Sequence, residues 1–211
     1  MRKEKCIKDS RIIPTTNELL GDKKINIGIY TKIQIESRHN DMDIHRYIYD
    51  YEINVSQWAK ELNLSRPTFN KGLKYLVETG ILKKFDTEER QGYKVCNRFK
   101  GFLLFDREFL RALLNVGANN LIKVYFVYYK YSMFYGSCRL TQEKILKEIG
   151  YSGISKDNKK MIKDINLDLE KLGLIEVRRI CEREKGSTKT LLIITAPIYY
   201  ETSFYKDMKA N

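Results

Sequence analysis

The sequence predicts an α+β fold, mainly helical, built from two similar domains in tandem. One helix-turn-helix pattern occurs twice, at residues 55–82 and 140–175, and each copy ends in a glycine and two aliphatic residues. Landmarks elsewhere repeat at nearly the same spacing, and they are Glu18 with Glu108, Tyr30 with Tyr125, and Gly80 with Gly173. A nearly constant spacing over separate landmarks indicates an internal duplication.

The duplicated pattern divides the 211 residues into two domains of ordinary size. The expected segments are a basic N-terminal tail at residues 1–10, a first domain at 11–100, a second domain at 101–198 and a C-terminal tail at 199–211. The C-terminal tail is rich in tyrosine, and we expect it to be a partner-binding segment or a loosely packed end.

A short extended lead-in opens the first domain, and a helix is expected from about Ile25 to Arg38. The following stretch, His39–Asp50, is polar and charged, which favours a loop or a short extra helix. A second helix is expected from Ser56 to Leu62, with the Ser56 hydroxyl as its N-cap.

The third helix of the first domain follows Ser65, its expected N-cap, and carries Pro67 in its first turn, where a missing N–H is harmless. Its core stripe is spaced i, i+4, i+7 and consists of Phe69, Leu73 and Leu76. Gly80 stands where a left-handed C-terminal cap is needed. Strands at 81–86 and 93–99, joined by a tip at 87–92, would then form a hairpin.

The second domain repeats this plan, with Thr141 and Ser155 as N-caps of its second and third helices. The apolar stripe of the third helix is Ile162, Ile165, Leu169 and Leu172. Its strands are expected at 175–180 and 190–196, joined by a flexible basic tip. A helix-turn-helix followed by a hairpin, or wing, is typical of a winged helix, so we expect two winged helix-turn-helix domains in tandem.

The first helix of the second domain, from about Asn120 to Phe134, is aromatic on every side. Such a helix is not expected to be solvated all round. We therefore expect residues 121–134 to be buried between the domains, or to bind a second copy of the chain or a replication protein.

The chain carries 39 Lys and Arg against 27 Asp and Glu, a formal charge of +12, which favours a polyanionic partner. Arginine pairs with guanine, asparagine with adenine, and lysine or threonine with phosphate. The residues expected to bind double-stranded DNA in the first domain are Ser65, Arg66, Thr68, Asn70, Lys71 and Lys74 on the third helix, and Arg90 and Lys94 in the wing. The alternative is a solvated helix face, and Glu88 and Glu89 weaken the case for the wing.

In the second domain, lysines dominate the first half of the third helix. The residues expected to contact DNA there are Ser155, Lys156, Lys159, Lys160 and Lys163, with Lys185 and Lys189 in the wing tip. Because lysine favours phosphate over base edges, this unit is expected to clamp the backbone more than to read sequence. The alternative is a helix that serves only the fold or a protein interface.

Other classes find little support in the sequence. The four cysteines are isolated and the only histidines are His39 and His45, so we expect neither a metal nor a cofactor. No catalytic motif is present, and we expect no enzyme activity. The most apolar stretch, Leu121–Tyr135, contains two lysines and is too short to cross a membrane, so we expect a cytoplasmic protein.

The chain resembles winged-helix replication proteins carried by plasmids and phages of low-GC Gram-positive bacteria in the strings Ile13-Pro14, Asn17–Leu20, Ile27–Tyr30, Val55–Ser65 and Leu76–Leu82. The whole chain is similar in its expected architecture to plasmid replication initiators that bind repeated origin sequences. This resemblance implies a DNA-binding protein that initiates or regulates replication. The alternatives are a transcriptional regulator with the same DNA chemistry, and a protein-interaction module that binds polymerase or a helicase loader.

Overall fold

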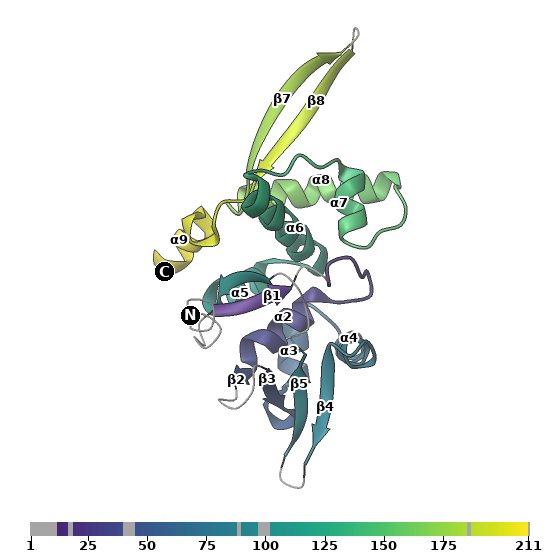
Figure 1. Ribbon diagram of the computed structural model, residues 1–211, viewed down its shortest axis with the longest axis vertical. Coiled ribbons are helices and arrows are strands. Elements are labelled where there is room, and N and C mark those ends of the chain that lie inside the picture. The colour runs from purple at the N-terminus through teal and green to yellow at the C-terminus, as the bar shows by residue number, and fades with distance from the viewer. Residues whose placement is uncertain are drawn as a thin grey trace. The chain divides into compact units, whose positions relative to one another are not determined.

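The computed structural model describes residues 12–16, 19–39, 45–87, 90–96, 102–184 and 187–210 (Figure 1). At residues 12–16, 39, 102, 182–184 and 187–191 it describes only the path of the backbone. As predicted, the described residues form an α+β structure, mainly helical, with small antiparallel sheets. The chain divides into two compact units, Met1–Asn119 and Asn120–Asn211, here called unit 1 and unit 2.

Unit 1 contains eleven elements among its described residues. In chain order they are β1 (Ile12–Thr16), α2 (Ile27–Glu36), β2 (Arg38–His39), β3 (Arg46–Tyr49), the 3-10 turn η1 (Asp50–Glu52), α3 (Val55–Glu61), α4 (Arg66–Glu78), β4 (Leu82–Asp86), β5 (Gln91–Val95), β6 (Phe102–Asp106) and α5 (Arg107–Val116). The predicted order of two helices, a turn and a hairpin is therefore present in α3, α4, β4 and β5. The hairpin tip is shorter than predicted, because the backbone N–H of Thr87 already donates to the Arg90 carbonyl at 2.9 Å.

The prediction of a loop or helix over His39–Asp50 is wrong for the described part of that stretch. Arg46–Tyr49 is strand β3, which lies between β2 and β5 in a sheet ordered β2-β3-β5-β4. Ile48 is fully buried, and so is Arg46, whose guanidinium donates to the Ser37 hydroxyl at 3.0 Å and to the Ser37 carbonyl. The stretch was predicted not to be a strand because it is rich in charge, but its Arg46 is an interior residue whose guanidinium is hydrogen-bonded to Ser37.

The boundary between the units falls later than the predicted one at residue 100. β6 pairs antiparallel with β1, so that Ile12 lies opposite Asp106 and Thr16 opposite Phe102. Helix α5 follows, with Asp106 as its N-cap, and its apolar face packs on α2 in unit 1. Strands β1 and β6, which the repeated plan places at the start of the first and of the second domain, are therefore paired with each other. Both belong to unit 1.

Helix α2 is the centre of unit 1, since every residue from Ile27 to Ile35 is buried. It contacts α4, α5 and β1. Gly72 lets α4 pack closely against α2, because a Cβ at that position would crowd the end of the Ile29 side chain. The predicted N-cap of α3 is wrong: the helix begins one residue earlier and is capped by Asn54, whose side chain accepts the Gln57 N–H at 3.1 Å.

Unit 2 contains seven elements among its described residues. They are α6 (Asn119–Tyr135), α7 (Gln142–Glu148), α8 (Lys156–Lys171), β7 (Glu176–Glu184), β8 (Ser187–Thr195), the 3-10 turn η2 (Tyr199–Glu201) and α9 (Ser203–Ala210). Strands β7 and β8 pair antiparallel along their whole length and are longer than predicted. The predicted N-caps Thr141 and Ser155 are confirmed, since each hydroxyl accepts a backbone N–H three residues later.

The turn between α3 and α4 and the turn between α7 and α8 are alike in backbone detail. Asn63 (φ 52°) and Gly150 (φ 88°) both adopt left-handed backbone after the second helix. In each turn the next residue donates back into that helix at 2.8 Å, Leu64 to Ala59 and Tyr151 to Leu146.

The aromatic helix α6 is buried from Leu121 to Tyr129. Within unit 2 its side chains form hydrogen bonds with α8, with α7 and with the residue that follows β8. Tyr128 donates to Asn166 of α8 at 2.6 Å, Tyr131 donates to Glu148 of α7 at 3.0 Å, and the Ser132 hydroxyl accepts the Ala196 N–H at 2.9 Å. Of the predicted partner surface at 121–134, the last two residues are exposed, as is Tyr135 after them.

No residue of η2 or α9, the two elements of the C-terminal segment, is buried. Thr202 is buried, and its hydroxyl accepts the backbone N–H of Tyr205 at 3.2 Å at the start of α9. Helix α9 reaches the end of α8, where a Cβ on Gly173 would overlap the Ser203 hydroxyl. Residues 199–210 are therefore part of unit 2 and close one end of α8.

Candidate nucleic-acid interface

Helix α4 begins as its sequence predicts. Ser65 caps it by accepting the Thr68 N–H at 3.3 Å, and Pro67 occupies the first turn, where no intrahelical donor is lost. Phe69 and Leu76 are buried, and Leu73 is half-buried. The glycine after the helix, Gly80, has the expected left-handed backbone with φ of 72°. This apolar stripe fixes which face of α4 points outward.

The outward face of α4 collects the predicted DNA-binding residues of the first domain. All are exposed, and they are Ser65, Arg66, Thr68, Asn70, Lys71 and Lys74. Two of them already serve the helix itself, because the hydroxyls of Ser65 and Thr68 lie 2.8 Å apart within the N-cap. Lys74 is 3.6 Å from Glu78, but an exposed pair of this kind contributes little energy and yields readily to a phosphate.

The hairpin β4–β5 places its two predicted contact residues on aromatic rings. The Arg90 guanidinium lies 5.4 Å from the ring centre of Tyr49 and donates to its hydroxyl at 3.1 Å. Lys94 lies 5.5 Å from the ring centre of Tyr47. Both cations are thus held over one face of the sheet. Glu88 and Glu89 lie outside the described residues.

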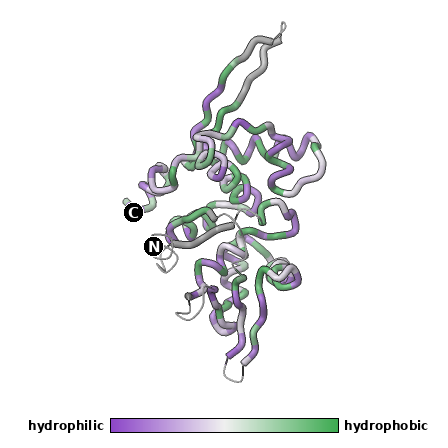
Figure 2. Tube along the Cα trace, viewed as in Figure 1, coloured by the Kyte–Doolittle hydropathy of each residue, from purple (hydrophilic) through white to green (hydrophobic). Residues whose placement is uncertain are grey.

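Helix α8 presents its lysines to solvent. Ser155 caps the helix by accepting the Asn158 N–H at 3.0 Å, and the exposed residues that follow are Lys156, Lys159, Lys160 and Lys163. The residues of the opposite face are apolar, so that hydropathy alternates along the α8 tube in Figure 2. Lysines beside a helix N-terminus oppose the helix dipole, so they cost stability unless an anion is present.

The predicted contacts at the tip of the second hairpin are Lys185 and Lys189. Lys185 lies outside the described residues, and Lys189 is described only as backbone on β8. Lower on the hairpin, Arg179 is 3.3 Å from Glu170 of α8.

One signal in the sequence was missed. Tyr47, Tyr49 and Tyr51 alternate along and just beyond β3, a period of two that places side chains on one face of a sheet. Tyr51 is 80% exposed. The alternation was readable, but the charged neighbours of these tyrosines favoured a loop.

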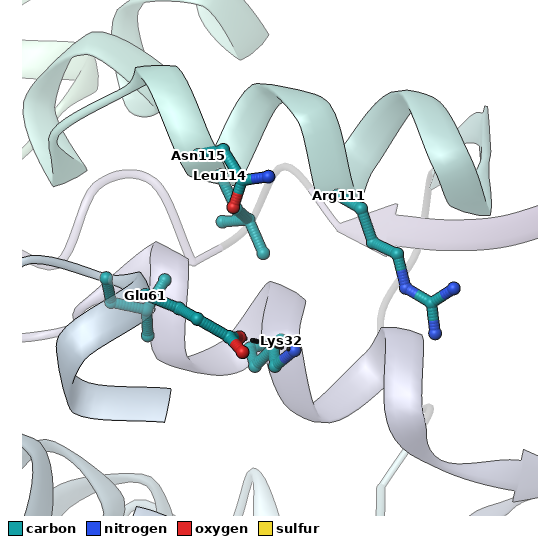
Figure 3. Close-up of a pocket in the computed structure, with 6 residues that line it drawn as sticks. Lys32, Glu61, Arg111, Leu114 and Asn115 are labelled. Atoms are coloured by element: carbon teal, nitrogen blue, oxygen red, sulfur yellow. Dashed lines mark ion pairs between the residues drawn. The ribbon is translucent and has the colours of Figure 1, made fainter. Parts of the chain in front are cut away.

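A charged hollow of about 350 Å³ in unit 1 lies between α2, α3 and α5. Figure 3 shows Lys32 and Glu61 meeting on one side of it, with Arg111 and Asn115 on the α5 side. The Lys32 ammonium is 2.7 Å from Glu61 and 3.0 Å from Glu36. Burial alone would raise the pKa of Glu61, but hydrogen bonds from Lys32 and Gln57 leave that pKa lowered. The charges facing this hollow are therefore already matched with one another.

Among the described residues, no group of three or more His, Cys, Asp and Glu side chains is placed to hold a metal ion. Cys96, Cys138 and Cys181 are free thiols, and burial raises the pKa of Cys138 to about 11. Within the same described ranges, no helix has the length and apolar character needed to cross a membrane.

Comparison with known proteins adds no relative. No family model matches this sequence, and no curated protein matches it at a significant level.

Proposed function

We propose that this protein is a non-enzymatic, sequence-specific binder of double-stranded DNA, made of two winged helix-turn-helix domains in tandem. The first would consist of α2, α3, α4 and the β4–β5 hairpin, and the second of α6, α7, α8 and the β7–β8 hairpin. The observation that carries the proposal is the exposed polar face of α4, on a helix whose opposite face is buried and whose start is capped.

In this proposal α4 reads bases. Arg66 and Asn70 are one helical turn apart on the exposed face, and their side chains can pair with guanine and adenine in the major groove. Lys71 and Lys74 would contact phosphates on either side. Ser65 and Thr68 would chiefly hold the first turn of the helix, since their hydroxyls bond each other.

Helix α8 would bind the DNA backbone. Four exposed lysines in its first half can contact phosphates, and an anion there would relieve their conflict with the helix dipole. Two linked DNA-binding units also raise affinity through effective concentration. The biological role that we propose is initiation or regulation of replication of a plasmid or phage in the cytoplasm, through repeated sites at an origin.

The experiment that tests the proposal is recovery of bound duplexes from a random pool with the full chain. We expect one preferred motif, and we expect Asn70→Ala to weaken binding to it by about 1–3 kcal/mol and to relax the preference at one base pair. Asn115→Ala is the matched control, because Asn115 is an exposed asparagine on α5 of the same unit. An unchanged ratio of preferred to scrambled DNA in Asn70→Ala would remove base reading from α4.

Two outcomes separate the proposal from its alternatives. Absence of salt-dependent binding to any duplex would favour a protein-interaction module, because phosphate contacts always release counterions. A motif that occurs once within a promoter, in place of direct repeats, would favour a transcriptional regulator over a replication protein.

A further inference from the structure

We propose that the outer face of the sheet β2-β3-β5-β4 binds single-stranded nucleic acid by stacking unpaired bases on its tyrosines. This site lies on a different element from α4 and does not depend on duplex recognition by that helix. It consists of two rows of side chains across the strands, here called the basic row and the aromatic row.

The basic row follows from strand register. Arg38 lies opposite Tyr47, Tyr47 opposite Lys94, and Lys94 opposite Lys83. Residues opposite each other in an antiparallel sheet share a face, so these four side chains cross the sheet as one line. Arg38 is 2.7 Å from Glu52 and Lys94 lies over the Tyr47 ring, so Lys83 is the exposed cation that this row offers to a phosphate chain.

The aromatic row lies one step further along the strands. Tyr49 and Phe85 both lie opposite Gly92, and their ring centres are 5.9 Å apart at 81°. A Cβ at Gly92 would overlap the Ile48 carbonyl oxygen and lie 3.0 Å from the end of the Phe85 ring, so a glycine is needed where that ring packs on β5. Tyr51 lies parallel to Tyr49, with ring centres 5.5 Å apart and 4° between the planes.

These rings are available from outside. Tyr51 is 80% exposed, and Tyr47, Tyr49 and Phe85 are each partly exposed. The core face of the same sheet is the opposite one, where Ile48, Val95 and Leu82 are fully buried. The rings of the outer face therefore lie outside this core, where they pack on one another and keep part of their surface accessible.

The combination of rings and cations identifies the ligand class. Every nucleobase has a π-face that stacks on an aromatic ring, and the phosphates between bases need nearby cations. A duplex hides those π-faces within its own stack, so this surface fits unpaired strands better than double-stranded DNA. Arg90 over the Tyr49 ring adds a guanidinium plane at the edge of the row.

Binding of a labelled oligothymidylate strand to the full chain, measured by fluorescence anisotropy, tests this site. We expect Tyr51→Ala to bind the strand about five- to hundredfold more weakly, the effect of losing one base stack, while Tyr51→Phe retains binding. Tyr200→Ala, which removes a tyrosine that is 51% exposed in unit 2, is the matched control.

Charge is tested by two neighbouring lysines on opposite faces of β4. Lys83→Gln should weaken binding of the strand and lower its salt dependence, while Lys84→Gln should not, because Lys84 lies over Tyr93 on the core side. Equal effects of the two substitutions would overturn the proposal, and so would wild-type binding by Tyr51→Ala or equal loss of strand and duplex binding by that variant. If no duplex is bound selectively but Tyr51-dependent strand binding persists, the proposed function fails and this site stands.

Discussion

Helices α4 and α8 stand at the same place in the two units, yet they are held by different means. Counting back from Gly80 and Gly173, Leu73 of α4 corresponds to Asn166 of α8. Helix α4 approaches α2 closely through Gly72, whereas α8 is tied to α6 by the buried bond between Asn166 and Tyr128.

Their outer faces differ as well. Helix α4 exposes Arg66 and Asn70, which can each make paired hydrogen bonds, while the first half of α8 exposes lysines. The two helices therefore share their N-caps and C-terminal glycines but differ in surface chemistry. The caps and glycines determine where each helix begins and ends. The exposed residues between the apolar positions determine the role that we propose for each helix, base reading for α4 and backbone binding for α8.

The largest difference in unfolding free energy between the two units should come from substituting the glycine after each helix, Gly80 after α4 and Gly173 after α8. Gly80→Ala should cost about 1–2 kcal/mol, because its left-handed backbone strains any other residue while nothing lies within 4 Å of the new Cβ. Gly173→Ala should cost about 2–5 kcal/mol, because the Cβ would also overlap Ser203 and force α9 to move. Urea denaturation measures both. Equal costs would mean that α9 does not close the end of α8.

The buried polar bond of unit 2 should give the next largest effect. Tyr128→Phe should cost about 1–3 kcal/mol, because it leaves the buried Asn166 side chain without its donor. Adding Asn166→Leu, which copies Leu73 of α4, should recover most of that loss, since neither partner then remains unsatisfied. A double-mutant cycle measures the coupling. Strictly additive losses would contradict the bond.

Alkaline pH should destabilise unit 2 through its buried tyrosines. Burial raises the pKa of Tyr129 to about 12, against about 10 in an unfolded chain. Its contribution to stability is therefore complete below pH of about 10 and is lost as pH rises towards about 12, by at most about 1.4 kcal/mol per pH unit. Tyrosinate absorbance and unfolding free energy against pH test this. Tyr129→Phe should flatten the fall, and an identical pH profile in that variant would refute the assignment.

The smallest expected effect on stability belongs to the α8 lysines, whose replacement should instead be visible in binding. Changing Lys159, Lys160 and Lys163 to Ala should weaken all duplexes alike and lower the log–log salt slope by roughly 0.9 for each phosphate that the protein no longer neutralises. Lys171→Ala, at the other end of the same helix, is the control and should leave the slope unchanged. If the triple variant keeps the wild-type slope, α8 does not clamp the backbone and the comparison with α4 loses its functional meaning.

Helix caps, C-terminal glycines and helix faces were predictable from the sequence, because they depend on residues only a few positions apart. The caps Ser65, Thr141 and Ser155 and the left-handed backbone of Gly80 were predicted, since each satisfies or ends a helix through its own turn. The exposed faces of α4 and α8 followed in the same way from the spacing of buried residues such as Phe69 and Ile162.

Long-range pairing was decided only by the tertiary structure. The ladder between β1 and β6 joins segments about a whole domain apart in the chain, and it moves α5 into unit 1. Strand β3 was not predicted from the sequence, because Arg46 can be buried only when folding brings the Ser37 hydroxyl to it as an acceptor. The sequence by itself determined which turns, caps and helix faces form. Tertiary structure decided which strands meet, and therefore where the aromatic face lies, because a β-ladder takes its partners from distant parts of the chain.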